Sequence, residues 1–194
     1  MAYLVLDLEW NMGQGGRRLE DTPIEGFTPP FNEIVQIGAT LCDLGIQPLS
    51  CIDLHIKSQF YQSLNPYVAK VTGLDSTDLQ EGLPFPKAWS TFQTWLDEHK
   101  LNDTPILLLS WADADTKVLI ENLKHYDLPT DLDFRVLDLQ RLYTRLIRSQ
   151  DNKQPALTTA LHQVGLQEDE TLRLHDAAVD AHYTAQILQA LLPY

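Results

Sequence analysis

Tyr3-Leu4-Val5-Leu6-Asp7-Leu8-Glu9 is a stretch that is apolar until Asp7 and then presents two carboxylates. The pattern predicts a β-strand over residues 3 to 9. Because alternate side chains of a strand share a face, Asp7 and Glu9 project on the same side, with Cα atoms about 6.6 Å apart. In open α/β sheets, ligands bind at the carboxyl ends of strands. The pair is therefore either part of a site or the acidic tip of a strand that runs into solvent.

The elements around this strand predict an α/β fold with a mixed sheet. Two more strands, at residues 33–43 and 49–57, follow around a turn near Gly45. The wholly apolar run 105–110 suits a strand covered on both faces, and 134–137 is the last predicted strand. Helices are predicted at 84–100, through Leu119, Leu123 and Tyr126, and at 138–149, 156–164 and 176–192. Residues 11–32 carry several Gly and Pro without periodicity, which indicates a functional or mobile loop.

Length and composition restrict the function classes. The 194 residues favour a single domain over 1–194, and 44% hydrophobic residues are enough for a sizeable core. No apolar run approaches the length of a membrane span, and no secretory signal is visible at the N-terminus, so we expect a cytoplasmic protein. The formal net charge of −13 repels polyanions. A role on nucleic acid would therefore need a local device, such as carboxylates that hold divalent cations.

The predicted last helix carries an acid where an apolar residue is expected. At 100° per residue, Asp180 falls inside the core-facing arc of Ala177, Ala181 and Thr184. An unpaired carboxylate there costs several kcal/mol, so it needs a cation, strong hydrogen bonds or a helix rotated enough to reach water. His175 cannot share that face and is expected in the loop or first turn before the helix. It is either a structural hydrogen bonder or a general base.

A third acidic segment, Trp111-Ala112-Asp113-Ala114-Asp115, follows the buried strand 105–110. There the chain turns from strand to helix, so an acid again lies at the carboxyl end of a strand. Asp113 suits the N-cap position of that helix. Asp115 could also be an N-cap residue instead of part of a site. The spacing of Asp115 to Val118 and Leu119 places it on the inward side of the first turn.

Taken together, these segments resemble the DEDDh 3′-to-5′ exonucleases, a family that includes polymerase proofreading subunits, RNase T and oligoribonuclease. The match spans most of the chain, and its form of the second motif is closest to bacterial and eukaryotic exoribonucleases with an SWGxxD-like sequence. Ala112 replaces the Gly common in that branch, and Gln36 replaces a frequent Glu. The segments that carry the resemblance are Leu6 to Glu9, Glu33 to Ala39, Val71 to Leu74 with Asp78-Leu79, Phe85 to Leu96, Ser110 to Asp115, and His175 to Ala181.

The resemblance implies a ribonuclease H-like fold with a five-stranded mixed sheet flanked by helices. It assigns metal-ligand roles to Asp7, Glu9, Asp115 and Asp180, with Asp115 preferred over Asp113, and the role of general base to His175. Packed carboxylates raise one another's pKa values, and divalent cations offset that repulsion. Two Mg²⁺ or Mn²⁺ ions are therefore expected, with hydrolysis that releases nucleoside 5′-monophosphates.

The expected substrates are single-stranded or frayed 3′ ends of RNA or DNA, and the branch favours RNA. Trp10 is a predicted stacking residue, with core packing as its alternative. The residue that would read the 2′-hydroxyl cannot be identified from the sequence. A homodimer or a protein partner would have to supply further binding regions. Basic residues that could track phosphates are Arg141, Arg145 and Arg148 on one helical face, and Arg17 and Arg18 in the glycine-rich loop.

Two other functions fit the same motifs. A proofreading exonuclease would prefer mispaired primer ends and associate with a DNA polymerase. A regulatory or adaptor protein could use an exonuclease-like domain for partner binding alone. The presence of all four acids and His175 argues against that second function, because binding alone does not require them.

Overall fold

The computed structural model describes most of the chain. The described residues are 2–12, 32–61, 63–100, 105–132, 134–147 and 153–192. The predicted loop over 11–32 lies outside them except at its two ends, which belong to strands. No helix within the described ranges is long and apolar enough to cross a membrane.

The described residues form the five-stranded mixed sheet that the sequence predicts, in the order β3-β2-β1-β4-β5. Strand β1 pairs antiparallel with β2 and parallel with β4; β3 and β5 extend the two sides. The acid-tipped β1 is therefore the central strand. The strands are β1 (Ala2–Met12), β2 (Asn32–Cys42), β3 (Pro48–His55), β4 (Ile106–Ser110) and β5 (Arg135–Asp138).

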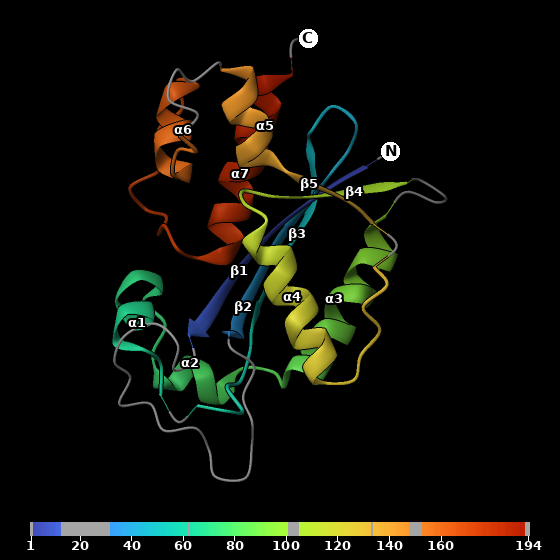
Figure 1. Ribbon diagram of the computed structural model, residues 1–194, viewed down its shortest axis with the longest axis vertical. Helices are drawn as coiled ribbons and strands as arrows, with labels where there is room; N and C mark the ends of the chain where they lie inside the picture. Colours follow the sequence, from blue (N-terminus) through green and yellow to red (C-terminus); the bar gives the residue numbers. More distant parts are fainter. Residues whose placement is uncertain are drawn as a thin grey trace.

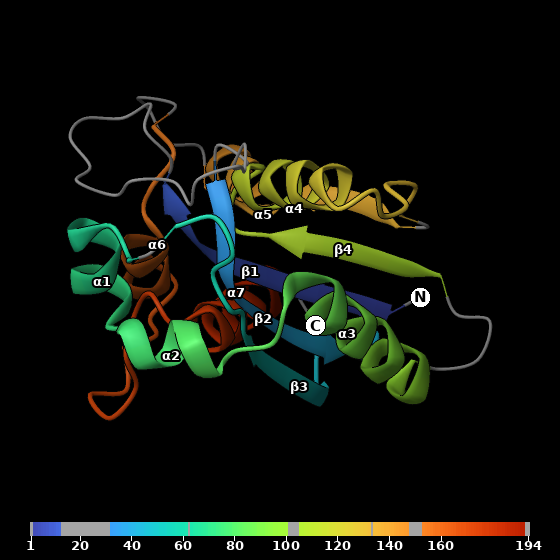
Figure 2. The ribbon, with the colours of Figure 1, turned by 90° about the horizontal axis from the view of Figure 1, so that it is seen from below.

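Helices cover both faces of this sheet (Figures 1 and 2). One face packs on α3 and α4, and the other on α5, α6 and α7. The helices are α1 (Pro66–Thr72), α2 (Ser76–Glu81), α3 (Phe85–His99), α4 (Ala114–His125), α5 (Leu139–Leu146), α6 (Leu157–Gln163) and α7 (Ala177–Leu191).

The short helices α1 and α2 were not predicted from the sequence. Each is too short to show apolar periodicity, and end signals define them instead. Asn65 caps α1 by accepting from Tyr67 N, with Pro66 at the first position. Asp75 and Asp78 form a capping box at α2. Local capping, rather than an apolar stripe, marks both helices in the sequence.

The alternation along β1 divides the core into two layers. Leu4, Leu6 and Leu8 point to the layer of α3 and α4, and all three are buried. Val5 points to the opposite layer, where it packs with α7 residues such as Ala181. Asp7 and Glu9 follow Val5 on that second face. The two acids therefore continue an apolar stripe that α7 covers.

Strand β1 is irregular at its acidic end. Glu9 pairs with Gln36 but Trp10 pairs with Ile34, so Val35 is an extra residue on β2. Such a bulge increases the local twist and re-aims side chains, commonly next to active sites. On its other side β1 pairs with β4 only as far as Val5. On that side, the backbone of the acidic end of β1 has no strand partner among the described residues, so side chains from helices can bond to it.

Candidate active site

Asp7 and Glu9 lie on the same face near the end of β1, as the strand pattern predicts. Both are half-buried. Their cross-strand partners on β2 are Gly38 and Gln36. Residues directly opposite each other in an antiparallel pair share a face, so all four lie on the side covered by α7.

Asp115 joins the pair from helix α4. It is 6% exposed, and its Oδ1 accepts a 3.1 Å hydrogen bond from Leu8 N. That amide lies beyond the last β1–β4 pair, so the carboxylate takes the place of a strand partner. Asp113 occupies the N-cap position without a side-chain capping bond and pairs instead with Lys117 Nζ at 2.7 Å. Asp115, and not Asp113, therefore faces β1.

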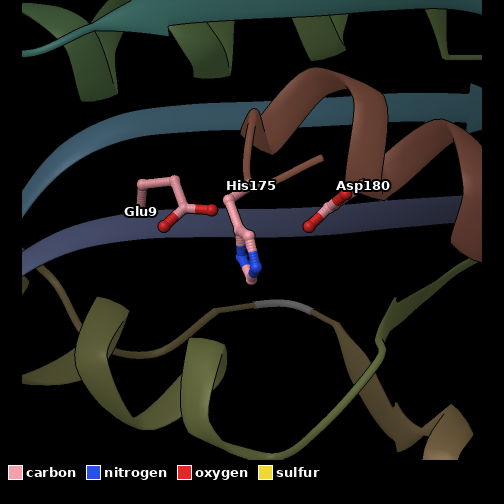
Figure 3. A group of neighbouring side chains, drawn as sticks. All are labelled: Glu9, His175 and Asp180. Carbon is pink, nitrogen blue, oxygen red and sulfur yellow. The ribbon is translucent and has the colours of Figure 1, made fainter. Parts of the chain in front are cut away.

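Asp180 and His175 come from the start of α7 and the loop before it. Asp180 is 8% exposed, and its Oδ1 has no hydrogen-bond partner among the described residues. His175 lies in the loop, exposed, with a left-handed backbone at φ 60°. Ligating atoms of Glu9, His175 and Asp180 all lie within 4.8 Å of one another. Figure 3 shows these three side chains next to one another, with His175 between Glu9 and Asp180.

Burial and mutual repulsion raise the pKa values of these carboxyls. Burial is the largest cause for each; it raises the pKa of Glu9 to about 8, with Asp180 and Asp115 adding repulsion. The pKa of Asp115 rises to about 7 although the Leu8 amide lowers it, and that of Asp180 rises to about 6. The pKa of Asp7 is also raised well above its usual range. The acids are therefore close enough to repel, and positive charge would stabilise the cluster.

These residues fit a divalent cation. Carboxylate oxygens are the donors that Mg²⁺ and Mn²⁺ prefer. A buried carboxylate oxygen without a partner, such as Asp180 Oδ1, is costly unless a cation or donor satisfies it. The raised pKa values describe the cluster without an ion, whose charge would reverse the shifts.

One further acid, Asp176, lies close to the cluster and was not predicted to do so. It caps α7 by accepting from Ala178 N at 3.0 Å and Val179 N at 3.3 Å. Its charge also raises the pKa values of Asp7, Glu9 and Asp180. An Asp directly ahead of a predicted helix is an N-cap signal, and that signal was available in the sequence.

The predicted substrate-binding residues differ in exposure and in the groups that they contact. Trp10 is half-buried and packs partly against the α3–α4 core. Arg141 lies 3.6 Å from Asp138 and 4.0 Å from Asp113, so it is near the second motif but already faces two acids. Arg145 is exposed. Arg148, Arg17 and Arg18 fall outside the described residues.

Comparison with known proteins gives a family and similar folds. The exonuclease family model named RNase_T matches residues 5–188. No curated protein matches the chain. The nuclease domain of 3'hExo, a DEDDh family member bound to rAMP, superposes with a TM-score of 0.79 and 15% identity over 97% of this chain and 90% of that one.

Two further structures extend this comparison. Cell-death related nuclease 4 (CRN-4) has a TM-score of 0.78 and 18% identity, over 97% of this chain and 62% of that chain. E. coli exonuclease I in complex with a 5cy-dT13 oligonucleotide has a TM-score of 0.61 and 13% identity, over 97% and 40%. These likenesses confirm the predicted ribonuclease H-like α/β fold. With the family match over nearly the whole length and the motifs in their expected order, the chain belongs to the DEDDh 3′-to-5′ exonuclease family.

Proposed function

We propose that this protein hydrolyses single-stranded nucleic acid from its 3′ end and releases nucleoside 5′-monophosphates, with RNA favoured over DNA. The observation that carries the proposal is the convergence of Glu9, His175 and Asp180 within 4.8 Å, with Asp7 and Asp115 close enough to shift the same pKa values. Binding alone would not require buried acids that repel one another, because their assembly costs stability.

In the proposed mechanism, Asp7, Glu9, Asp115 and Asp180 hold two divalent cations, either Mg²⁺ or Mn²⁺. When bound, such ions supply positive charge that activates water and stabilises the leaving 3′ oxygen. The chain itself contributes fixed positions for these oxygens. Asp115 is anchored to β1 through Leu8 N, and Asp180 is held in the first turn of α7. This preorganisation avoids rearrangement during the reaction.

His175 is proposed as the general base that takes the proton of the attacking water. Its ring is exposed and lies beside Glu9 and Asp180, so water and substrate can reach it. The left-handed backbone at φ 60° is uncommon outside glycine, although His adopts it more often than most residues.

The substrate preference draws on the family branch and on two neighbours. The 3'hExo domain was crystallised with rAMP, a ribonucleotide monophosphate, and E. coli exonuclease I with an oligonucleotide. A single strand can bring its 3′ end to the exposed ring of His175. Trp10 is proposed to stack on a base, and Arg141 and Arg145 to follow the phosphates.

The test uses 5′-labelled RNA and DNA of identical sequence, each with a free or a blocked 3′ end. After chelation, Mn²⁺ or Mg²⁺ should restore a ladder that shortens from the free 3′ end, faster on RNA, and release 5′-monophosphates. Asp7→Ala should nearly abolish it. A mispaired DNA primer that is cut faster than single-stranded RNA would favour proofreading instead. Intact substrates with both metals would overturn the proposal.

A further inference from the structure

Gln36 is a buried polar side chain in the middle of strand β2. It is 1% exposed and lies between Val35 and Ile37 on β2. Its cross-strand partner on β1 is Glu9. Buried amides are costly unless hydrogen-bonded, so its bonds show what the residue does.

Both ends of the Gln36 amide are used, and only one orientation satisfies them. Nε2 donates to Asp53 Oδ1 at 2.9 Å, and Oε1 accepts from Ala177 N at 3.2 Å. A carboxylate only accepts and a backbone amide only donates, so turning the amide over would lose both bonds. Asp53 on β3 therefore fixes the direction in which Gln36 offers its oxygen to α7.

That oxygen accepts a hydrogen bond from Ala177 N, the N–H group in the first turn of α7 that neither the helix nor its cap satisfies. Helix N-termini leave their first N–H groups without intrahelical partners. Here Asp176 accepts from Ala178 N and Val179 N through its side chain, and from Asp180 N through its carbonyl. Ala177 N is left, and it bonds to Gln36.

The same turn of α7 rests directly on the backbone of β2. A Cβ built on Gly38 would lie 2.0 Å from Ala177 C and 2.1 Å from Ala178 N. Only glycine permits this approach. Gln36 and Gly38 are two residues apart on one face of β2, so together they set both the contact and its hydrogen bond. His175 and Asp180 flank this turn, and both lie beside Glu9 (Figure 3).

We propose that Gln36 is a positioning residue of the active site: with Asp53, it holds the first turn of α7 so that His175 and Asp180 face Glu9. The effect on catalysis rests on the proposed function, but the hydrogen bond to Ala177 does not. Both ends of the Gln36 amide bond to Asp53 and Ala177, so its loss should act through the position of α7 and reduce kcat and cation affinity more than KM for the oligonucleotide.

The experiment compares three variants of the full chain. Gln36→Leu keeps approximate volume without the hydrogen bonds. The double variant Gln36→Glu with Asp53→Asn keeps the net charge and restores both bonds. In it the carboxylate at position 36 accepts from Ala177 N and from the amide at position 53. Thr40→Val is the matched control, because it removes a buried polar atom from the same face of β2, farther from the start of α7.

For Gln36→Leu we expect kcat and Mn²⁺ affinity each to fall about 10- to 100-fold, as for other residues that orient metal ligands, with KM within about twofold. The Ala177 amide should exchange on the order of tenfold faster by NMR. The double variant should recover most of each loss, and Thr40→Val should change none of the three. A folded Gln36→Leu protein with wild-type kcat, Mn²⁺ affinity and Ala177 exchange would overturn the proposal, as would a double variant no better than Gln36→Leu.

Failure of the proposed function gives a different result. Wild-type protein would then leave every oligonucleotide intact. Mn²⁺ affinity and the exchange of the Ala177 amide would still test Gln36, because neither readout requires turnover. Wild-type values of both in Gln36→Leu would reject the positioning role in that case too.

Discussion

Two buried acidic regions of this chain differ in how their oxygens are satisfied. Glu33 on β2 is 1% exposed and accepts from Ser58 Oγ and Gln59 N, each at 2.6 Å, and from Phe60 N at 3.2 Å. In the candidate active site, Asp180 Oδ1 is buried without a partner among the described residues, and the neighbouring side chains include other carboxylates. Burial alone therefore does not identify a functional acid. A buried carboxylate that keeps an oxygen without a donor and lies among other carboxylates is the stronger indication.

The largest expected effect comes from the unsatisfied acid. Asp180→Asn keeps the shape of the side chain but removes its charge, so kcat should fall about 10²- to 10³-fold through lost electrostatic stabilisation. The free energy of unfolding of the metal-free protein should not fall, because the change relieves repulsion. Single-turnover hydrolysis and chemical denaturation measure the two quantities. Full activity in this variant would remove Asp180 from the site.

His175→Ala should lower kcat about 10²-fold, at the lower end for a general base, with little change in Mn²⁺ affinity. The matched control is His182→Ala, another histidine in the same segment, whose Nε2 lies 3.0 Å from Gln186 Nε2. A pH–rate profile of both variants checks the assignment. Equal losses in the two variants would contradict a specific role for His175.

The pH dependence of stability should report the burial and repulsion of the carboxylate cluster. The raised pKa values of Glu9, Asp115 and Asp180 mean that the folded metal-free protein binds more protons than the unfolded chain. This contribution to stability is therefore complete below about pH 4 and is lost as pH rises through about 6 to 8. Thermal unfolding at constant ionic strength measures it. Stability that rises over that window would contradict the assignment.

Cation addition should reverse that loss. Mn²⁺ at a hundredfold excess over its Kd should stabilise the folded protein by about 2.7 kcal/mol, because the ion binds the folded state alone. Binding should also release protons from the cluster, since the ligands must be ionised. Chemical denaturation curves with and without Mn²⁺ measure the gain. Asp180→Asn should reduce it, whereas a variant at Glu33 should keep it.

The smallest effect on activity belongs to the satisfied acid. Glu33→Gln replaces one accepting oxygen with a donor that faces Ser58 or Gln59, so the free energy of unfolding should fall by about 1 to 3 kcal/mol. Activity of the folded variant should stay within about threefold of wild type. A large loss of kcat without a loss of stability would show that Glu33 belongs to the catalytic machinery.

Sequence periodicity was sufficient to predict the strands, the longer helices and the faces on which the acids lie. The strand pattern at residues 3–9 predicted that Asp7 and Glu9 share a face, and the helical arc predicted the inward position of Asp180. The inward spacing of Asp115 likewise matches its bond to Leu8 N. In each case a repeat within one element determines where the side chain points, so no long-range information was needed.

Features that depend on contacts between distant segments could not be predicted. The bulge opposite Glu9, the bond from Ala177 N to Gln36 and the ion pair of Arg141 with Asp113 all arise from tertiary packing. Arg141 was expected on a basic face, yet it also lies beside Asp113, a residue of a distant segment that the helical spacing could not indicate. The roles of the site residues themselves stay predictions until variants are measured.

The most direct test of the shared cation site is anomalous diffraction from crystals of the wild-type protein soaked in Mn²⁺. We expect manganese peaks in contact with the carboxylates of Asp7, Glu9, Asp115 and Asp180, and no peak at Glu33. Manganese bound elsewhere on the protein, with the space among those four side chains empty, would contradict the account.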